Sequence, residues 1–206
     1  SNGRIKFHRG HEVNLENIKF KTGDSYYSHI KIKSNDTLVF FDQNGFIYNM
    51  SSENHQTSRG DGEPLSKFFN LQDGTNMVGM FNHSSKESIL LCSDKGYGFI
   101  TVHDEQSVRS KKGKKIMNVG KSQTIYPVVT DVESDLYYLV ITSTGYMLIE
   151  KINQIPIMSK GKGIKLINIP KASNETIIYL GVLNPGQELQ FNYTGKRSRQ
   201  MTFNDL

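Results

Sequence analysis

Short apolar runs recur along the chain, and each is soon interrupted by glycine, asparagine, aspartate or serine. Runs of this kind, rich in β-branched and aromatic residues, predict β-strands. The expected strands cover residues 30–33, 37–41, 46–50, 88–92, 98–103, 136–141, 146–150, 176–180 and 188–193. No segment sustains an apolar period of 3.6 residues, so few helices are expected. The pattern predicts an all-β protein.

The apolar runs belong to a unit that recurs about every fifty residues. In each copy, two runs flank a turn that ends in glycine, at Gly45, Gly96 and Gly145. Glycine supplies the positive φ that a tight hairpin turn requires, so each pair of runs predicts a β-hairpin. Each copy then continues through a glycine-punctuated stretch, at 58–62, 109–115 and 159–165. A further apolar strand with asparagine in third place is expected at 68–71, 116–119 and 166–169.

This repeat predicts a radial array of small sheets, because one small sheet cannot bury its own face without a neighbour. The 206 residues and the 36% apolar content are enough for one domain with a real core. Residues 3–33 and 176–206 are expected to supply incomplete units at the two ends. Ser1 and Asn2 resemble a cloning remnant, so residues 3–206 are expected to form one domain of a longer protein.

The net charge of +5 is distributed unevenly. Four windows without acidic residues, 4–9, 109–121, 160–171 and 196–199, hold 16 of the 25 lysines and arginines. The rest of the chain carries 9 basic and 20 acidic residues. Basic loops on an acidic body indicate a polyanionic partner, and contacts with phosphates would give salt-dependent affinity with little sequence preference.

The candidate residues for contact with such a partner are therefore the lysines and arginines of these windows. They are Arg109, Lys111, Lys112, Lys114, Lys115, Lys121, Lys160, Lys162, Lys165, Arg4, Lys6, Arg9, Lys196, Arg197 and Arg199. The loop 58–62 differs, because Asp61 and Glu63 neutralise Arg59. We expect this loop to contribute little to binding a polyanion.

Other chemistry finds little support in the sequence. Cys92 is the only cysteine, which excludes an intramolecular disulfide, and its place in a predicted strand favours a buried apolar role. Gly120-Lys-Ser122 lacks the upstream glycine of a phosphate-binding loop, and His8 and His11 have no further metal-ligand pattern around them. No catalytic residues and no metal site are expected, since no set of catalytic groups converges.

The hairpin aromatics are expected to pack between the sheets rather than to stack on bases. They are Phe40, Phe46, Tyr48, Tyr97, Phe99, Tyr138 and Tyr146. This expectation favours binding to a duplex backbone over binding to single strands. No apolar stretch is long enough to span a bilayer, and no secretory signal opens the chain, so neither secretion nor membrane insertion is expected.

Several stretches, in order along nearly the whole chain, match one known family. They are Gly3-Arg-Ile5, Lys21-Thr-Gly-Asp-Ser25, Ser58-Arg-Gly-Asp-Gly-Glu-Pro-Leu65, Asp94-Lys-Gly-Tyr-Gly-Phe99, Ser159-Lys-Gly-Lys-Gly-Ile-Lys-Leu-Ile-Asn-Ile-Pro170 and Gly195-Lys-Arg197. With these the chain resembles the C-terminal domain of the A subunit of bacterial DNA topoisomerase IV, which is related to the same domain of the gyrase A subunit. The resemblance implies a β-pinwheel, a propeller-like ring of about five four-stranded blades that exchange strands, with incomplete end blades here. It also implies a basic outer face that binds and bends duplex DNA.

The resemblance further implies that this domain is the non-catalytic part of an ATP-dependent type II topoisomerase, an isomerase that changes DNA topology. It would present duplex DNA to the cleavage core for decatenation, supercoil relaxation and chromosome segregation. The family's nucleophilic tyrosine follows an arginine in another domain, and no Arg-Tyr pair occurs here. No cofactor is expected in this domain, since ATP and Mg belong to other domains or to the second subunit.

The implied partners are duplex DNA, the B subunit of topoisomerase IV in a heterotetramer and a condensin-type chromosome-organising protein, with no small-molecule substrate. The implied location is the cytoplasm, at the nucleoid, with the parent complex peripheral at the inner membrane.

One departure from the family pattern bears on the kind of DNA binding. Gyrase carries a Gln-Arg-Arg-Gly-Gly-Lys-Gly box that lets its domain wrap DNA, and this chain holds no full copy. The nearest matches are 109–115 and Lys160-Gly-Lys-Gly163. This favours topoisomerase IV over gyrase and argues against strong chiral wrapping. A gyrase-type wrapping domain and a propeller-like protein-interaction module, bound through the acidic body, remain the alternatives.

Overall fold

The computed structural model describes residues 3–10, 13, 18–20, 22–53, 60–83, 87–120, 124–170, 172–193 and 197–202. For 103, 105, 191–193 and 197–202 it describes the backbone alone. The strands are β1 (Arg4–Ile5), β2 (Thr37–Asp42), β3 (Phe46–Ser51), β4 (Glu63–Pro64), β5 (Met77–Asn82), β6 (Ser88–Ser93), β7 (Tyr97–Thr101), β8 (Lys114–Lys115), β9 (Ile125–Thr130), β10 (Tyr137–Thr142), β11 (Met147–Lys151), β12 (Ile164–Lys165), β13 (Ile177–Leu183), β14 (Glu188–Tyr193) and β15 (Arg197–Thr202). The described part of the chain holds no α-helix, only short 3₁₀ helices such as η2 (Leu65–Lys67), η4 (His103–Gln106) and η5 (Ile152–Gln154).

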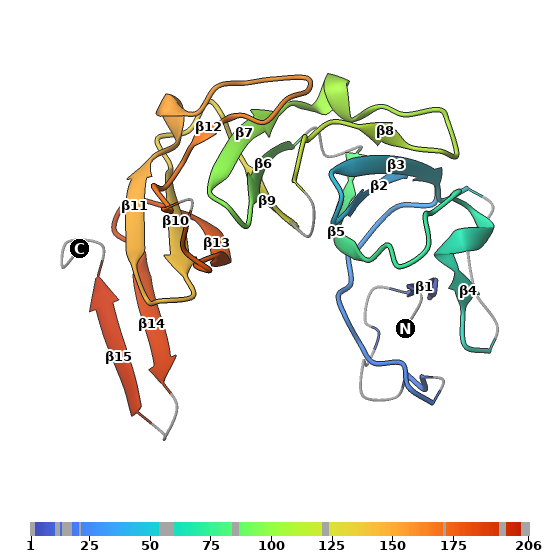
Figure 1. The fold of residues 1–206 in the computed structure, drawn as a ribbon. Helices are drawn as coiled ribbons and strands as arrows, with labels where there is room; N and C mark the ends of the chain where they lie inside the picture. The colour runs from blue at the N-terminus through green and yellow to red at the C-terminus, as the bar shows by residue number, and fades with distance from the viewer. Residues whose placement is uncertain are drawn as a thin grey trace.

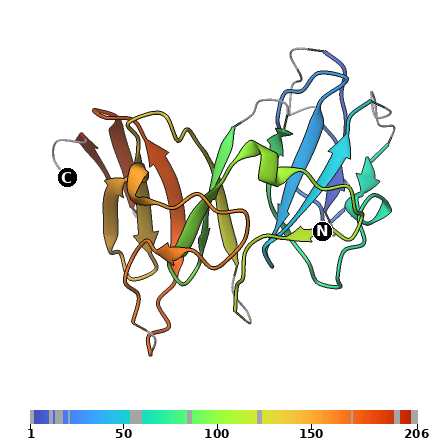
Figure 2. The same cartoon turned by 90° about the horizontal axis from the view of Figure 1, so that it is seen from above.

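The strands form small antiparallel sheets, or blades, arranged along an open arc (Figure 1). Blade A has the strand order β5-β2-β3-β8, blade B the order β9-β6-β7-β12, and blade C the order β13-β10-β11. The pairs β1-β4 and β14-β15 lie at the two feet of the arc. Seen from above, the blades stand side by side in chain order (Figure 2). These sheets confirm the all-β pinwheel; among the described residues, two blades have four strands.

The central hairpin of each blade is closed by the same local chemistry. A side-chain oxygen three residues before the turn glycine accepts a hydrogen bond from the amide just after it. The pairs are Asp42 with Phe46 at 2.9 Å, Ser93 with Tyr97 at 3.3 Å and Thr142 with Tyr146 at 3.2 Å. The glycines have φ values of 84° at Gly45, 80° at Gly96 and 89° at Gly145, as the turn pattern predicts. A capping residue and a left-handed glycine therefore fix each hairpin.

The fourth strand of a blade comes from the next repeat unit. In blade A, β8 pairs with β3, and in blade B, β12 pairs with β7, in both cases antiparallel. The pair β1-β4 follows the same pattern, because β4 stands one repeat before β8. Strand exchange, which the family resemblance implies, is therefore present in the structure.

The core lies between the blades, and the hairpins of blades A and B are apolar on both faces because each lies between two core clusters. Successive side chains of a strand point to opposite faces. In β6, Ile89 and Leu91 face the cluster shared with blade A, whereas Leu90 and Cys92 face the cluster shared with blade C. In β2, Val39 and Phe41 likewise face blade B. A blade removed from the array would expose one of its two apolar faces to water.

Some strand expectations are wrong. Residues 30–33 form no strand, although Ile30 and Ile32 pack against the core cluster that contains Phe40 and Tyr48. A cleft of about 650 Å³ lies beside this segment and is lined mainly by residues of 3–10, of 18–32 and of strands β2 and β5. The stretches 68–71, 116–119 and 166–169 are also not strands. Their apolar side chains instead fill the space between blades, as Met117 and Leu166 do.

Candidate nucleic-acid interface

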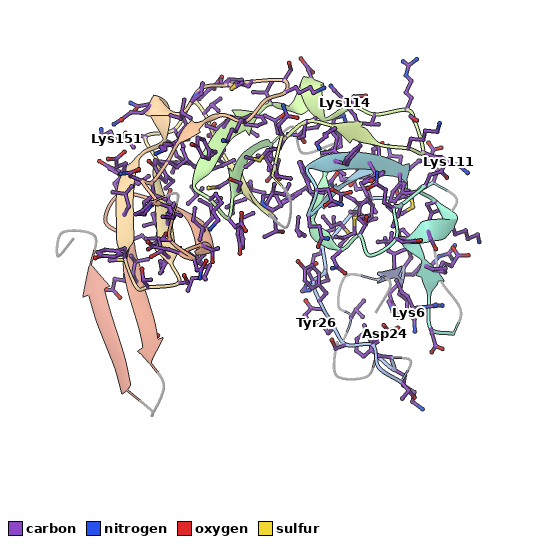
Figure 3. The ribbon with its side chains drawn as sticks, in the orientation of Figure 1. Lys6, Asp24, Tyr26, Lys111, Lys114 and Lys151 are labelled. Carbon is purple, nitrogen blue, oxygen red and sulfur yellow. The ribbon has the colours of Figure 1, made fainter. Side chains whose placement is uncertain are left out.

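The two strongly basic stretches lie on the convex edge of the arc. Each leaves its own unit, crosses the outer edge of the preceding blade and ends in that blade's fourth strand (Figure 1). Lys111 and Lys114 lie along this edge over blade A (Figure 3). Lys114 and Lys115 thus belong to strand β8 and Lys165 to strand β12, although the sequence suggested loops throughout.

The first basic stretch, 109–115, is held in a defined shape. A tight turn forms where the Gly113 amide donates to the Ser110 carbonyl at 3.0 Å and the Lys112 amide donates to Ser110 Oγ at 3.2 Å. The Asn70 amide, from the preceding unit, donates to the Lys111 carbonyl at 2.8 Å. Arg109, Lys111 and Lys112 are exposed, and Lys114 and Lys115 are half-buried along the strand. The turn therefore presents its cations to solvent from a fixed backbone.

The second basic stretch, 160–165, has the equivalent anchor on blade B. The Asn118 amide donates to the Gly161 carbonyl at 2.7 Å, and the Gly161 amide donates to the Ile116 carbonyl at 2.9 Å. Its cations, Lys160, Lys162 and Lys165, are all exposed. Lys165 Nζ also donates to Asn168 Oδ1 at 2.8 Å. The repeated asparagine of the sequence thus marks the point where one unit holds the basic loop of the next.

The loop glycines have a structural reason of their own. Gly62, Gly113 and Gly163 have positive φ values of 78°, 72° and 78°. A Cβ there would lie 2.5 Å from the Ile5 carbonyl oxygen, 2.8 Å from that of Ile47 and 2.0 Å from that of Gly98, respectively. Glycine is therefore required where each exchanged strand joins the preceding blade.

The N-terminal cations are partly used within the fold. Arg4 Nη2 donates to the Gly62 carbonyl at 2.5 Å, and Arg4 Nε donates to the Asp61 carbonyl at 3.2 Å. Lys6 is half-buried and Arg9 is exposed. Arg4 therefore ties β1 to residues 61 and 62 while its side chain remains exposed.

Four of the sequence-predicted cations have no described side chain. Lys121 and Lys196 lie outside the described residues. Arg197 and Arg199 lie on strand β15, and only their backbone is described.

The loop 58–62 differs in charge from the basic stretches 109–115 and 160–165, as the sequence indicated. Asp61 is exposed, and Glu63 forms an ion pair with Lys67. Arg59, the partner that the sequence suggested for Glu63, lies outside the described residues; the described partner is Lys67.

Exchanging Asp61 and Glu63 for serine is expected to strengthen duplex binding about three- to tenfold near physiological salt, because two anions leave the path of the phosphates. Fluorescence anisotropy with a labelled duplex measures this change. Serine at the exposed Glu53 and Glu133, outside the basic stretches, makes the same charge change and controls for net charge. Equal affinities of the Asp61/Glu63 variant and the wild type would contradict the expectation.

The aromatic expectations are correct in part. Phe40, Tyr48, Phe99 and Tyr138 are buried. In contrast, Phe46 and Tyr97 are half-buried, and Tyr146 is 70% exposed. These last three residues each follow a hairpin glycine.

Among the described residues, neither a reactive thiol nor a group of metal ligands is found. Cys92 is fully buried, and burial with the nearby Asp94 raises the pKa of its thiol well above the ordinary range. No three His, Cys, Asp or Glu side chains are grouped as metal ligands within the described ranges. No helix in the described part of the chain is long and apolar enough to cross a membrane.

Comparison with known proteins gives consistent results. Residues 87–125 and 137–184 match the family described as DNA gyrase C-terminal domain, beta-propeller. The A subunit of DNA topoisomerase 4 from Haemophilus influenzae is 33% identical over 208 residues, and that from Escherichia coli K12 is 31% identical over the same number. Each alignment covers 99% of this chain but 28% of the relative, so the chain spans under a third of those proteins.

A solved structure agrees with these relatives. The E. coli ParC C-terminal domain superposes with a TM-score of 0.83 at 32% identity, covering 96% of this chain and 81% of that one. The C-terminal domain of a DNA topoisomerase IV, at 16% identity and a TM-score of 0.70, shares the fold.

Proposed function

Because the chain belongs to the C-terminal domain family of the topoisomerase IV and gyrase A subunits, we propose that it binds duplex DNA along its convex edge and bends it. The domain itself performs no bond-breaking step and uses no cofactor of its own. Its partner is the phosphate backbone of a duplex rather than a particular base sequence. The surface that carries this function consists of 109–115 on blade A and 160–165 on blade B.

One observation supports the proposal above the others. Two basic stretches are held at equivalent places on consecutive blades, each anchored by a backbone hydrogen bond from the preceding unit. Cations on loops with a fixed backbone can meet successive phosphates without first ordering the chain. Because the edge is convex, a duplex that touches both stretches must curve around it (Figure 1).

The free energy of phosphate contacts is large enough to offset the cost of bending DNA. Each neutralised phosphate releases counterions, and the logarithm of the affinity falls with the logarithm of salt with a slope of about −0.9 per contact. Bending a 20 to 30 bp site by 40 to 90° costs on the order of 1 to 6 kcal/mol. The eight lysines and arginines of the two stretches could offset a bend within this range. The bend is modest rather than a chiral wrap, since the gyrase box is incomplete here.

In the parent protein, the domain would hold a DNA segment and present it to the cleavage core during decatenation and supercoil relaxation. That protein would assemble with the B subunit and act at the nucleoid in the cytoplasm. This role places the bent duplex next to a catalytic site that other domains provide.

The proposal is tested by titrating a labelled 30 bp duplex and a single strand of equal length across roughly 50 to 200 mM salt. We expect tighter binding of the duplex, a steep salt slope and, with dyes at both DNA ends, increased energy transfer on binding. Equal affinity for the single strand would contradict the assignment of the duplex backbone. Binding without a change in energy transfer would remove bending from the proposal.

A further inference from the structure

The residue after each hairpin glycine is aromatic in all three blades. These residues are Phe46, Tyr97 and Tyr146. Their amides are capped in the same way, so the three rings start from equivalent positions at the outer edge. In blades A and B the same residue lies opposite a lysine of the exchanged strand, Phe46 opposite Lys115 and Tyr97 opposite Lys165. The rings therefore lie beside the basic stretches.

In both of these blades a lysine covers the ring. Lys162 Nζ lies 3.7 Å from the centroid of Tyr97, and Lys115 Nζ lies 5.6 Å from that of Phe46. The two lysines hold different places in the repeat, because Lys115 corresponds to Lys165 and not to Lys162. The shared feature is thus the ring, which attracts a nearby ammonium group to its negative face.

We propose that Tyr97, and more weakly Phe46, are positioning residues of the DNA-binding edge, which hold Lys162 and Lys115 in place for phosphate. The inference rests on the proposed function. A lysine side chain loses much rotamer freedom when it is fixed. Because the ring already restricts Lys162, less of this loss remains for the step in which DNA binds. The ammonium keeps its positive charge and can still donate to phosphate oxygens.

Blade C offers an internal comparison. Tyr146 is 70% exposed, and within the described ranges no lysine lies over its ring. Within the described residues, strand β11 pairs only with β10. No exchanged strand there lies next to the Tyr146 ring. Tyr146 is thus the same residue type at the same repeat position as Tyr97, without a cation.

The test combines DNA affinity with a contact measured without DNA. Tyr97→Leu is expected to weaken duplex binding about two- to fivefold, which corresponds to the ~0.5–1 kcal/mol of an exposed cation–π pair. Its salt slope should equal that of the wild type, because Lys162 keeps its charge. Lys162→Met should instead reduce the slope by about one. In NMR spectra of the free protein, the ε protons of Lys162 should be shifted upfield by the ring and lose this shift in Tyr97→Leu.

Two controls distinguish positioning from structural damage. Tyr97→Phe keeps the ring and should restore affinity, and Tyr146→Leu should leave it unchanged. Tyr97→Leu in the background of Lys162→Met should have no further effect. Additive losses in the double variant, or wild-type affinity of Tyr97→Leu, would overturn the inference and leave the proposed function intact. If the wild-type protein did not bind duplex DNA, the proposed function and this inference would both be wrong, whatever the NMR shift of Lys162.

Discussion

Gly45→Ala is expected to destabilise the protein by about 3–4 kcal/mol, measured by urea unfolding. Two effects combine at this residue. A non-glycine residue is strained at a φ of +84°, and its Cβ would lie 2.3 Å from the Met117 carbonyl oxygen. That carbonyl belongs to the next repeat unit, whose Ile116 and Met117 amides donate to the Gly45 carbonyl at 2.9 and 3.1 Å. The substitution therefore separates blade A from the unit that completes it.

Gly145→Ala is the matched control. Gly145 holds the same turn position with a φ of +89°, but a Cβ there would meet nothing within 4 Å. It should cost only the conformational strain, about 1–2 kcal/mol. The difference between the two variants measures the contact between units. Equal destabilisation would show that blade A does not depend on this contact.

The largest loss of DNA affinity is expected when Lys111, Lys112, Lys114 and Lys115 are all replaced by alanine. The variant lacks four cations of one anchored stretch. The slope of log affinity against log salt should therefore become shallower by about three to four, and the affinity at ~0.1 M salt should decrease on the order of a hundredfold. The backbone should remain in place, because Gly113 and the Asn70 hydrogen bond are unchanged. Anisotropy titrations at several salt concentrations measure both quantities.

The control for this variant removes the same charge elsewhere. Lys19, Lys31, Lys33 and Lys67 are exposed and lie outside the basic stretches. Their fourfold replacement by alanine should lower affinity only slightly, through the change in net charge. Comparable losses in the two quadruple variants would mean that DNA responds to total charge rather than to the edge.

The sequence predicts well what is encoded locally. Each hairpin combines a turn glycine and two apolar runs within about fifteen residues, and all three hairpins appear as expected. Strand β9 was missed because Pro127 interrupts its apolar pattern. Proline is tolerated there because β9 is the edge strand of blade B. Strand β5 was missed as well, since its Gly79 weakens the strand signal.

The exchanged strands could not be predicted from local pattern. Lys115 pairs with Phe46, from which it is separated by a whole repeat unit, and the strand that makes this pair is two residues long. The lysines and arginines of the candidate site could be predicted, because clusters of basic residues can be read directly from the sequence. The aromatic rings beneath them were predicted in the core, although the repeat places an aromatic residue directly after each hairpin glycine. Only the three-dimensional arrangement shows that the exchanged strand brings a lysine opposite this residue in blades A and B.

The central claim is that one duplex contacts both basic stretches along the convex edge. Site-directed DNA cleavage tests it most directly, with an iron chelate attached to a cysteine introduced at Lys112→Cys or, in a second protein, at Lys162→Cys. The native Cys92 is fully buried and should remain unlabelled. We expect cleavage of the same duplex from both positions, spread over many nucleotides because binding has no sequence preference. We expect none from a chelate at Ser25→Cys, an exposed residue between Asp24 and Tyr26 at the foot of the arc (Figure 3). Cleavage from neither lysine position, or from Ser25→Cys alone, would contradict the claim.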